Sequence, residues 1–308
     1  MNKKVLAIVA AAAVVVAGGA YLLKGNKVES KYSEGAIEVT HKLGTTVLNE
    51  APKNVVVLDF GALDVLSEMD VKCDFHETTL RINPDNIKRS PLPAGKIKSL
   101  RASYYFMGAL LGRFGKAVVG FPGGDDIGPR PIDQHIKGFE ALGATVENEN
   151  DQIIITAPKT GLRGAKIHLK MPSVGATMNI IMASVMAKGQ TIIENAAKEP
   201  EIIDLATFLN NMGAVIRGAG TEVIRIEGVE ELKAQTPHTI IPDRIEAGTY
   251  VALAACIGNG IRIHNIIEEH LDSYLAKVEE MGVVIDADED SLYVYPAGDL
   301  KMIQVRTD

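Results

Sequence analysis

Apolar and polar positions follow a pattern that repeats three times from about residue 94 onward. In each copy, an apolar helical run ends at a glycine that opens a short strand, and a second helix then ends at another glycine. A hairpin-like pair of strands closes each copy. The first helical runs span Arg101–Phe114, Ser173–Lys188 and Arg244–Asn259, and the glycines that end the second helices are Gly143, Gly213 and Gly282. A period of about seventy residues suits a strand–helix–strand–helix–hairpin unit rather than a solenoid of short repeats.

The first helices of the second and third copies are apolar on nearly every side. Their apolar residues are Ile180, Ile181, Met182, Val185 and Met186 in one helix, and Val251, Leu253, Ala254 and Ala255 in the other. A helix that is hydrophobic all round must be buried, so the pattern predicts an α/β fold with sheets packed around these helices. The same pattern places Cys256 in the core. The second helices are amphipathic and are expected further out; in the third copy their apolar face holds Leu271, Tyr274, Leu275 and Val278.

The N-terminus has a different character. Lys3 and Lys4 precede an unbroken run of small apolar residues from Val5 to Leu23. A basic start followed by about 20 apolar residues predicts either an uncleaved membrane anchor or a signal peptide, and both remain open. A buried core helix is a third alternative, which the absence of a polar face disfavours. Residues 1–35 therefore form a signal-like or anchor-like segment with a polar linker, and residues 5–23 are a candidate membrane contact.

Composition narrows the function classes. The 308 residues suffice for two domains with proper cores, and 46% hydrophobic with 23% charged residues is ordinary for a globular protein. A net charge of −7 without a dense Lys/Arg tract argues against nucleic acid as the main partner. Cys73 and Cys256 lie far apart in the sequence and form no ligand pattern, so neither a disulfide framework nor a metal site is indicated.

The densest group of unusual residues is the stretch 121–135, FPGGDDIGPRPIDQH, between a strand-like run and an amphipathic helix. Its three prolines fix φ and remove backbone donors, and its three glycines allow sharp turns. Arg130 stands just before the helix start, where its guanidinium and nearby backbone N–H groups can face an anion together. The alternative is a turn-rich connection with solvated charges.

Residues 36–72 resemble a different class of protein. A short alternating strand, a turn at Pro52, a buried strand at 55–58 and a helix from Gly61 to Met69 follow one another. This order resembles the beginning of the iron-siderophore substrate-binding proteins of bacterial import systems. The next stretch, CDFHETTLRINP, is hairpin-like, as at the end of a repeat. Two unrelated sequences are therefore expected to meet near Val71–Lys72.

Long motifs from residue 73 onward resemble those of one enzyme family. They are RASYYFMGALLGRFGKAVVGFPGGDDIGPRPIDQHIKGFEALGA, SVGATMNIIMAS, IENAAKEPEIIDLA and IPDRIEAGT. In this order and spacing they are similar to the UDP-N-acetylglucosamine 1-carboxyvinyltransferases, which are enolpyruvyl transferases. The resemblance implies an inverse α/β fold of two domains, each with three repeats around buried helices. Residues 73–239 then hold the end of a first repeat and two full repeats of one domain, and residues 240–308 hold the first repeat of the other.

The resemblance also implies a reaction, the first committed step of peptidoglycan synthesis. The 3′-hydroxyl of UDP-N-acetylglucosamine adds to C2 of phosphoenolpyruvate, a proton goes to C3, and phosphate is eliminated. This chemistry needs an acid, a base and cations around two anionic groups, and the family implies no cofactor. Family members act in the cytoplasm, which conflicts with the export-like or anchor-like residues 5–23.

The resemblance further assigns substrate contacts. Arg130 matches the arginine that contacts phosphoenolpyruvate, and Arg101 matches the arginine of the sugar-nucleotide site. The nucleotide-binding stretches match Pro131, Ile132, Asp133 and Gln134 together with Met171, Pro172, Ser173 and Val174. Without the family, Arg101 is interpreted as a surface charge at a helix start and Ser173 as a helix N-cap.

Asp125 matches the place of the family's loop cysteine, which donates a proton or acts in product release and which the epoxide fosfomycin alkylates. Some members carry aspartate there, and a carboxylic acid can donate the same proton once loop closure removes it from water. Asp126 is the alternative, although the register favours Asp125. Without a thiol in the loop, resistance to fosfomycin is expected. Glu199, Glu201 and Arg244 lie in motifs near the family's cleft and are further candidates; for the two glutamates, an acidic helix start is the alternative.

Two parts of the family's site have no counterpart in the sequence. The lysine–asparagine pair that holds phosphoenolpyruvate is missing from residues 1–72, and the loop that carries the family's aspartate base would follow residue 308. Impaired catalysis is therefore expected. A catalytically inactive fusion or fragment is the alternative, and a membrane-anchored siderophore-binding protein is a third hypothesis that would need a second lobe.

Overall fold

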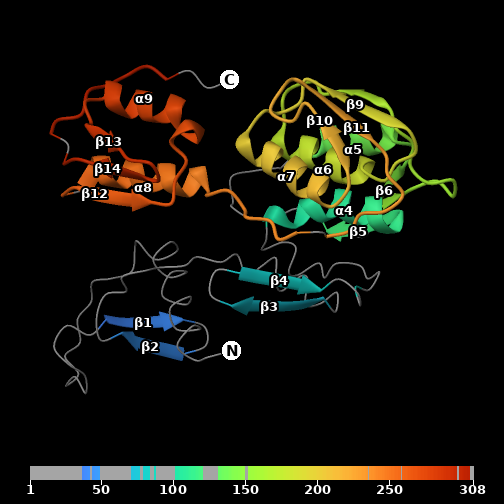
Figure 1. Cartoon of the computed structure of the whole chain (residues 1–308), viewed down its shortest axis with the longest axis horizontal. Coiled ribbons are helices and arrows are strands. Elements are labelled where there is room, and N and C mark those ends of the chain that lie inside the picture. Colours follow the sequence, from blue (N-terminus) through green and yellow to red (C-terminus); the bar gives the residue numbers. More distant parts are fainter. Residues whose placement is uncertain are drawn as a thin grey trace. The chain divides into compact units, whose positions relative to one another are not determined.

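The chain divides into two compact units, residues 1–100 and 101–308, in a computed structural model (Figure 1). The structure describes residues 37–41, 44–48, 71–76, 79–83, 87, 101–120, 131–149, 152–234, 236–257, 259–296 and 298–305. The apolar segment 5–23, the elements expected at 55–69 and the loop 121–130 lie outside these residues. Among the described helices, none is long and apolar enough to cross a membrane.

The described part of the first unit contains two antiparallel hairpins. β1 (Ile37–His41) pairs with β2 (Gly44–Leu48), and β3 (Lys72–His76) pairs with β4 (Thr79–Asn83). The strand expected after residue 36 and the hairpin expected from residue 73 are therefore confirmed.

The first full repeat combines two helices with one antiparallel sheet. Its elements are η1 (Arg101–Tyr104), α4 (Tyr105–Phe114), β5 (Lys116–Gly120), α5 (Asp133–Ala141), β6 (Thr145–Glu149) and β7 (Gln152–Thr156). The strand order is β5-β7-β6, so the closing hairpin folds back and its second strand pairs with β5. Val119, Ile153 and Ile155 are fully buried on one face of this sheet, and alternate residues are partly exposed, as a one-sided sheet requires.

The second repeat adds one strand in front of its first helix. Its elements are β8 (Lys166–His168), α6 (Val174–Ser184), β9 (Gln190–Glu194), α7 (Pro200–Asn211), β10 (Val215–Arg217) and β11 (Val223–Glu227). The strand order is β10-β11-β9-β8, and β8 runs parallel to β9 because α6 forms the crossover between them.

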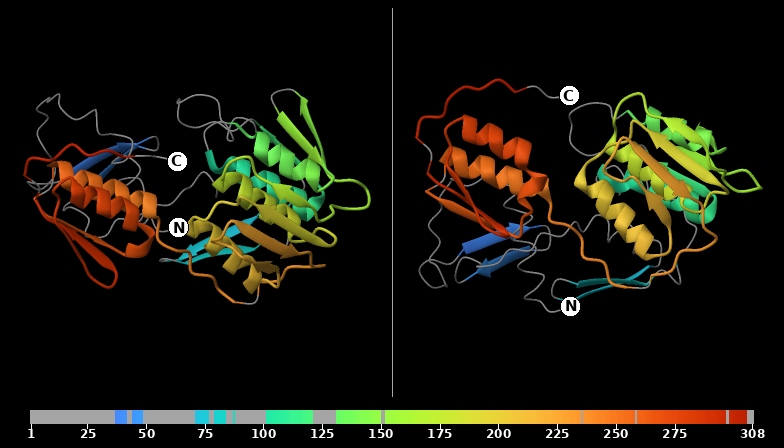
Figure 2. Two further views of the ribbon diagram at one scale, coloured as in Figure 1. Left: turned by 90° about the horizontal axis from the view of Figure 1, so that it is seen from above. Right: turned by 45° about the horizontal axis from the view of Figure 1, so that its top comes forward.

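The third repeat reproduces the sheet of the first. Its elements are α8 (Arg244–Ile257), β12 (Ile261–His264), η2 (Glu268–His270), α9 (Asp272–Glu280), β13 (Ile285–Ala287) and β14 (Ser291–Val294), with strand order β12-β14-β13. Helices α8 and α9 lie beside each other over this sheet (Figure 2). Its core joins Val251 and Ala254 of α8 to Leu275 and Val278 of α9 and to Leu292 of β14.

The six glycines predicted to end helices all have positive φ, namely Gly115, Gly143, Gly189, Gly213, Gly260 and Gly282. Four of them lie at a helix C-cap or directly after it, as predicted, namely Gly115, Gly143, Gly213 and Gly282. Gly189 lies beyond the end of α6 at Ser184 and does not cap that helix. At Gly115, φ is 67° and the backbone N–H donates to Leu111 O at 2.9 Å, which closes α4 with a left-handed cap. The chain then leaves the helix axis and enters the strand.

Helices α4 and α6 approach each other through glycine. A Cβ atom on Gly108 would lie 2.3 Å from Asn179 O, and one on Gly112 would lie 2.6 Å from Met182 O. The Asn179 side chain is fully buried between the helices, where Oδ1 accepts from Gly108 N at 2.7 Å and Nδ2 donates to Gly175 O at 3.2 Å. The predicted burial of the first helices is thus confirmed for α6, at a helix distance that only glycine permits.

Three burial predictions are wrong. Met186 is 38% exposed because α6 ends at Ser184, before the predicted end at residue 188. Leu253 is 44% exposed and Cys256 is exposed, although both lie in α8, which covers residues 244–257 of the predicted helix 244–259. α8 buries Ala247, Val251, Ala254 and Ala255 against its own repeat, and the described residues leave its other face uncovered.

Candidate functional site

The starts of α5 and α6 lie side by side. Met171 N donates to Gln134 Oε1 at 3.3 Å, which ties the segment before α6 to the first turn of α5. A Cβ atom on Gly175 would lie 3.0 Å from His135 Nε2 and 2.8 Å from Tyr104 Cε2. Glycine at 175 therefore lets three helix starts, those of α4, α5 and α6, meet at one place.

The segment 171–174 presents the N-terminus of α6 to solvent. Met171 is 62% exposed, Pro172 is exposed, and Ser173 and Val174 are partly exposed. Ser173 is the N-cap of α6, since its Oγ accepts from Ala176 N at 3.3 Å, and the N-cap interpretation is confirmed. The remaining first-turn N–H groups have no intrahelical acceptor, so this helix start offers donors and a positive dipole end to an anion.

His135 is the most unusual side chain of this region. It is 6% exposed, and neither ring nitrogen has a hydrogen-bond partner among the described residues. Its ring lies edge-on to Tyr104, with the ring centroids 5.5 Å apart. Burial lowers the pKa of His135 to about 4, against the opposing effect of Asp133, so the imidazole is neutral at pH 7. It carries one donor and one acceptor nitrogen, and both are buried without a partner in the described residues.

The loop 121–130 joins β5 to this site. Asp125, Asp126 and Arg130 lie outside the described residues, but Pro131 follows Arg130 directly, so the loop ends at the start of α5. Arg101 is the first residue of η1, which runs into α4 beside the same site. Of the predicted substrate-binding segments, 131–134 and 171–174 lie together, because Met171 N donates to Gln134 Oε1.

A second loop, residues 195–199, lies on the other side of α6 and is tied down at successive residues. Asn195 has a positive φ of 55°, and its Nδ2 donates to Leu169 O at 3.0 Å. Ala197 N donates to Thr177 Oγ1 of α6 at 3.1 Å. These contacts fix the loop both to the segment before α6 and to α6 itself.

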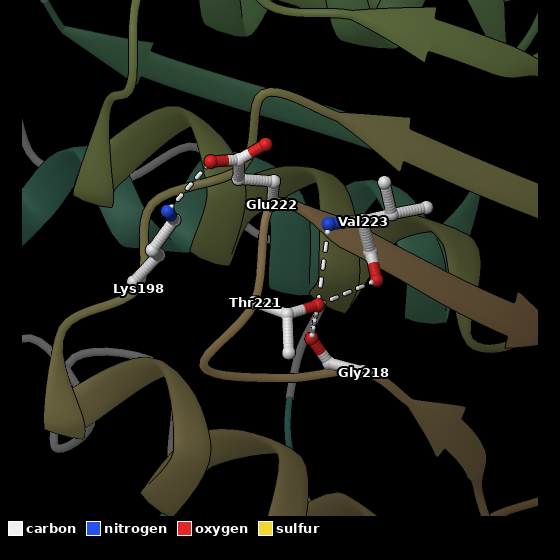
Figure 3. A network of polar contacts seen from close by, with 5 residues as sticks. All are labelled: Lys198, Gly218, Thr221, Glu222 and Val223. Atoms are coloured by element: carbon white, nitrogen blue, oxygen red, sulfur yellow. Dashed lines mark hydrogen bonds and ion pairs between the residues drawn. The ribbon is translucent and has the colours of Figure 1, made fainter.

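The hairpin β10–β11 holds the same loop from the side (Figure 3). Ala196 N donates to Glu222 O at 3.0 Å, and Lys198 Nζ lies 2.8 Å from Glu222 Oε1. Thr221 shapes the turn, because its hydroxyl lies 2.8 Å from Gly218 O and accepts from Val223 N at 3.3 Å (Figure 3). The start of α7 therefore has a defined position relative to α6.

Glu201 of α7 and Arg244 of α8 bind each other. Arg244 Nη2 donates to Glu201 Oε1 at 3.0 Å, and Arg244 Nε donates to Glu201 Oε2 at 3.2 Å. The hydrogen bond to Glu201 raises the pKa of Arg244, and Glu199 and Asp243 add to the effect. Glu199 is the N-cap residue of α7 without a side-chain capping bond, and its Oε2 is buried without a partner among the described residues.

His135, Tyr104 and Asn195 are site residues that sequence reasoning did not single out. His135 directly follows the matched segment 131–134, and Tyr104 and Asn195 lie within the quoted family motifs, which were the available signals. In the ranges that the structure describes, no group of three or more His, Cys, Asp or Glu side chains is placed to hold a metal ion.

Comparisons with known proteins identify similar sequences. A UDP-N-acetylglucosamine 1-carboxyvinyltransferase of Lactobacillus johnsonii is 99% identical over 246 residues, which cover 80% of this chain and 58% of that relative. The protein of the same name from Lactobacillus acidophilus is 87% identical over 262 residues, or 85% of this chain and 60% of the relative. The chain thus spans less than two thirds of the length of these relatives.

Solved structures share the fold. The enolpyruvyl transferase NikO from Streptomyces tendae matches with a TM-score of 0.66 at 22% identity, over 77% of this chain and 58% of that chain. An EPSP synthase from Acinetobacter baumannii matches with a TM-score of 0.58 at 17% identity, over 80% of this chain and 58% of that chain. The expected inverse α/β fold of the enolpyruvyl transferases is therefore confirmed.

A family profile identifies the protein family of this chain. The profile described as EPSP synthase (3-phosphoshikimate 1-carboxyvinyltransferase) matches residues 56–307. It begins within the stretch 36–72, whose resemblance to siderophore-binding proteins these comparisons do not support; the boundaries at 72 and 239 stay predictions. The resemblance to enolpyruvyl transferases is confirmed, and the chain belongs to the EPSP synthase (3-phosphoshikimate 1-carboxyvinyltransferase) family.

Proposed function

We propose that this chain serves the transfer of the enolpyruvyl group from phosphoenolpyruvate to the 3′-hydroxyl of UDP-N-acetylglucosamine. The relatives that are 99% and 87% identical carry the name of this activity. The observation that carries the proposal is the junction of the α5 and α6 starts, where exposed helix N–H groups lie beside a neutral, unpartnered His135. A nucleotide offers both an anion for the helix start and polar groups for the imidazole.

The nucleotide then lies along the segments 131–134 and 171–174. The start of α6 faces the diphosphate, because backbone N–H groups and the helix dipole both favour negative charge there. Ser173 Oγ accepts from Ala176 N as a cap, so its O–H can still donate beside the backbone N–H groups. Arg101 and Arg130 supply the cationic groups, with Arg130 directed to phosphoenolpyruvate.

The loop 121–130 supplies the chemistry. The 3′-hydroxyl gives its proton to a base and adds to C2 of phosphoenolpyruvate while C3 takes a proton. The tetrahedral adduct then loses phosphate from C2 and a proton from C3, which restores the double bond. Asp125 is our candidate for the acid that protonates C3. Glu199, whose buried carboxylate oxygen has no partner in the described residues, remains a candidate near the same cleft. We expect the reaction in the cytoplasm and no cofactor.

Calorimetry on the full chain tests the nucleotide site. UDP-N-acetylglucosamine should bind, and His135→Phe, which keeps a ring but removes both nitrogens, should weaken binding about tenfold, since a buried partner is lost. Glu222→Gln is the control, because this exposed carboxylate lies outside the proposed site and should leave binding unchanged. Equal binding by the wild type and His135→Phe would contradict the proposed site, and no binding at millimolar nucleotide would contradict the function.

A phosphate-release assay with both substrates tests the role of Asp125, with residues 73–308 grafted into a full-length family member that supplies the missing site residues. Asp125→Ala should lower the rate about 10²–10⁴-fold, the usual cost of a lost general acid. Asp125→Cys should keep activity and become sensitive to fosfomycin, since a thiolate opens an epoxide far faster than a carboxylate does. A covalent epoxide adduct on Asp125 of the unsubstituted chain, detected by mass spectrometry, would show that this residue has a different role.

A further inference from the structure

The segment that connects the second repeat to the third runs along α7. Lys233 N donates to Met212 O at 2.9 Å, just beyond the C-terminal end of α7. Further along the segment, His238 Nε2 lies 3.0 Å from Asp204 Oδ1. At its end, Arg244 forms the two hydrogen bonds to Glu201 described above. Because later residues meet earlier positions of α7, the segment runs antiparallel to the helix.

These contacts use one face of α7. Glu201, Asp204 and Phe208 stand three and four residues apart and therefore project from the same side of the helix. The Phe208 ring lies 5.2 Å from the His238 ring, and the paired His238 and Asp204 side chains are only 13% and 16% exposed. The opposite face carries Ile202, Ala206 and Leu209, which are buried in the second repeat. α7 thus joins the core of its own repeat to the connecting segment.

Arg244 marks the point where the segment becomes α8. The preceding residue, Asp243, caps the helix, with Oδ1 accepting from Ile245 N at 2.8 Å and from Glu246 N at 3.2 Å. Asp243 therefore fixes the backbone at the start of α8, and Glu201 fixes the side chain of Arg244. A guanidinium held by both oxygens of one carboxylate has a defined direction, which a single contact would not give.

We propose that Glu201 and Arg244 are positioning residues that fasten the start of α8 to the start of α7, with Asp204 and His238 as a second fastening. Glu201 occupies the Nε–Nη2 edge of the Arg244 guanidinium, so this edge is not available to a substrate anion. The pair instead fixes the distance between the braced loop 195–199 and the first turn of α8. This inference goes beyond the proposed function and does not rest on it.

Amide hydrogen exchange on the full chain, without substrate, tests the proposal. In Glu201→Gln, which keeps the shape and removes the charge, amides of 236–248 should exchange about tenfold faster, since a hydrogen-bonded charge pair has lost its attraction. Arg244→Gln should give the same increase, and the double variant should be no faster than either single one. Exchange at Ile180–Ala183 of α6 should stay unchanged and reports that the fold is intact.

Two further variants complete the design. The charge swap Glu201→Arg with Arg244→Glu should return exchange at 236–248 to within about threefold of the wild type, because the attraction is restored. Glu222→Gln, which breaks the exposed pair with Lys198 elsewhere in the same repeat, is the matched control and should change nothing in 236–248. Unchanged exchange in the single variants, additive rates in the double variant or no recovery in the swap would each overturn the proposal. Failure of nucleotide binding would affect the proposed function alone.

Discussion

The buried imidazole of His135 makes the stability of this fold depend on pH in a defined direction. Its pKa of about 4 in the folded chain lies below the ordinary value of 6.5, and the cause is burial. Below pH 6.5 the unfolded chain takes up a proton that the folded chain does not bind. Stability therefore falls as the pH drops from about 6.5 to about 4, and this histidine has almost no effect above pH 7.

The size of the effect follows from the two pKa values. Proton linkage with 6.5 and about 4 gives a loss of about 2 kcal/mol at pH 5 and about 3 kcal/mol at pH 4, relative to pH 7. Such a loss is large beside the total stability of about 5–15 kcal/mol that is usual for a folded domain. Because the side chain is 6% exposed, solvent screening does not reduce this figure much.

Two measurements on the full chain check the prediction. In an NMR titration of carbon-13-labelled histidine, the signal that disappears in His135→Gln should titrate near pH 4. In urea unfolding at pH 7 and pH 5, His135→Gln should show a smaller fall in stability than the wild type, by about 2 kcal/mol. Glutamine leaves the same site polar at both pH values, so the difference between the two pH values isolates the proton.

His264→Gln is the matched control. His264 is exposed on β12, so its replacement should leave the pH dependence of unfolding as it is in the wild type. The reasoning would be refuted if the His135 signal titrated near 6.5, or if His135→Gln lost as much stability between pH 7 and pH 5 as the wild type.

Two substitutions test the helix contacts in the same unfolding assay. Gly108→Ala should destabilise by about 1–3 kcal/mol, because its Cβ would lie 2.3 Å from Asn179 O, whereas Gly248→Ala should stabilise by about 0.5–1 kcal/mol, since its nearest contact at 3.5 Å is ordinary and alanine favours a helix. Equal effects at the two glycines would show that α4 and α6 are further apart than described. Ser173→Ala should cost about 1 kcal/mol through the lost N-cap of α6, and a neutral result would mean that the cap bond does not form in solution.

The repeat architecture could be predicted because the glycines that separate its helices and strands are local sequence signals. A glycine after an apolar run indicates a helix end from the local sequence, so Gly115, Gly189 and Gly260 marked the units without any tertiary information. The same reasoning placed the end of α6 too late, at residue 188 instead of Ser184. Val185 to Lys188 are apolar enough to continue a helix, but the chain turns there, with Ala187 N donating to Ser184 O at 2.9 Å.

Burial was less predictable, because it depends on neighbours that periodicity does not reveal. α6 and α8 look alike in sequence, yet α6 is covered by α4 and α5, while the described residues cover only one face of α8. Leu253 and Cys256 lie on the uncovered face for this reason.

In the site, too, contacts between residues close in sequence could be predicted, and contacts between distant residues could not. The cap of α6 by Ser173 is a contact over three residues, and the sequence predicts it. The burial of His135 depends on Tyr104 and Gly175, which belong to two other helices. The ion pair of Glu201 with Arg244 joins residues that are 43 positions apart, a distance over which no periodic pattern pairs two charges.

The two described loops that lead from a strand to the second helix of a repeat, after β9 and after β12, use one device to set where that helix begins. Asn195 and Asn265 end their strands with positive φ, at 55° and 57°. In each case the next backbone N–H donates to the closing hairpin, to Glu222 O at 3.0 Å and to Asp290 O at 3.2 Å. An asparagine in the left-handed region turns the chain without the entropic cost of glycine, and the hairpin then holds the turn. The start of the second helix is thereby fixed relative to its sheet.

This fixed geometry explains how similar repeats acquire different chemistry. The start of a second helix meets the segment that leads into the next repeat's first helix, as Gln134 meets Met171 and as Glu201 meets Arg244. The backbone arrangement is alike, so the side chain at the contact decides the outcome. A neutral amide leaves the donors of the α6 start free for a ligand, whereas a carboxylate opposite an arginine closes the contact into an ion pair. On this reasoning, we propose that the junction at Gln134 binds substrate, whereas the junction at Glu201 fastens two repeats together.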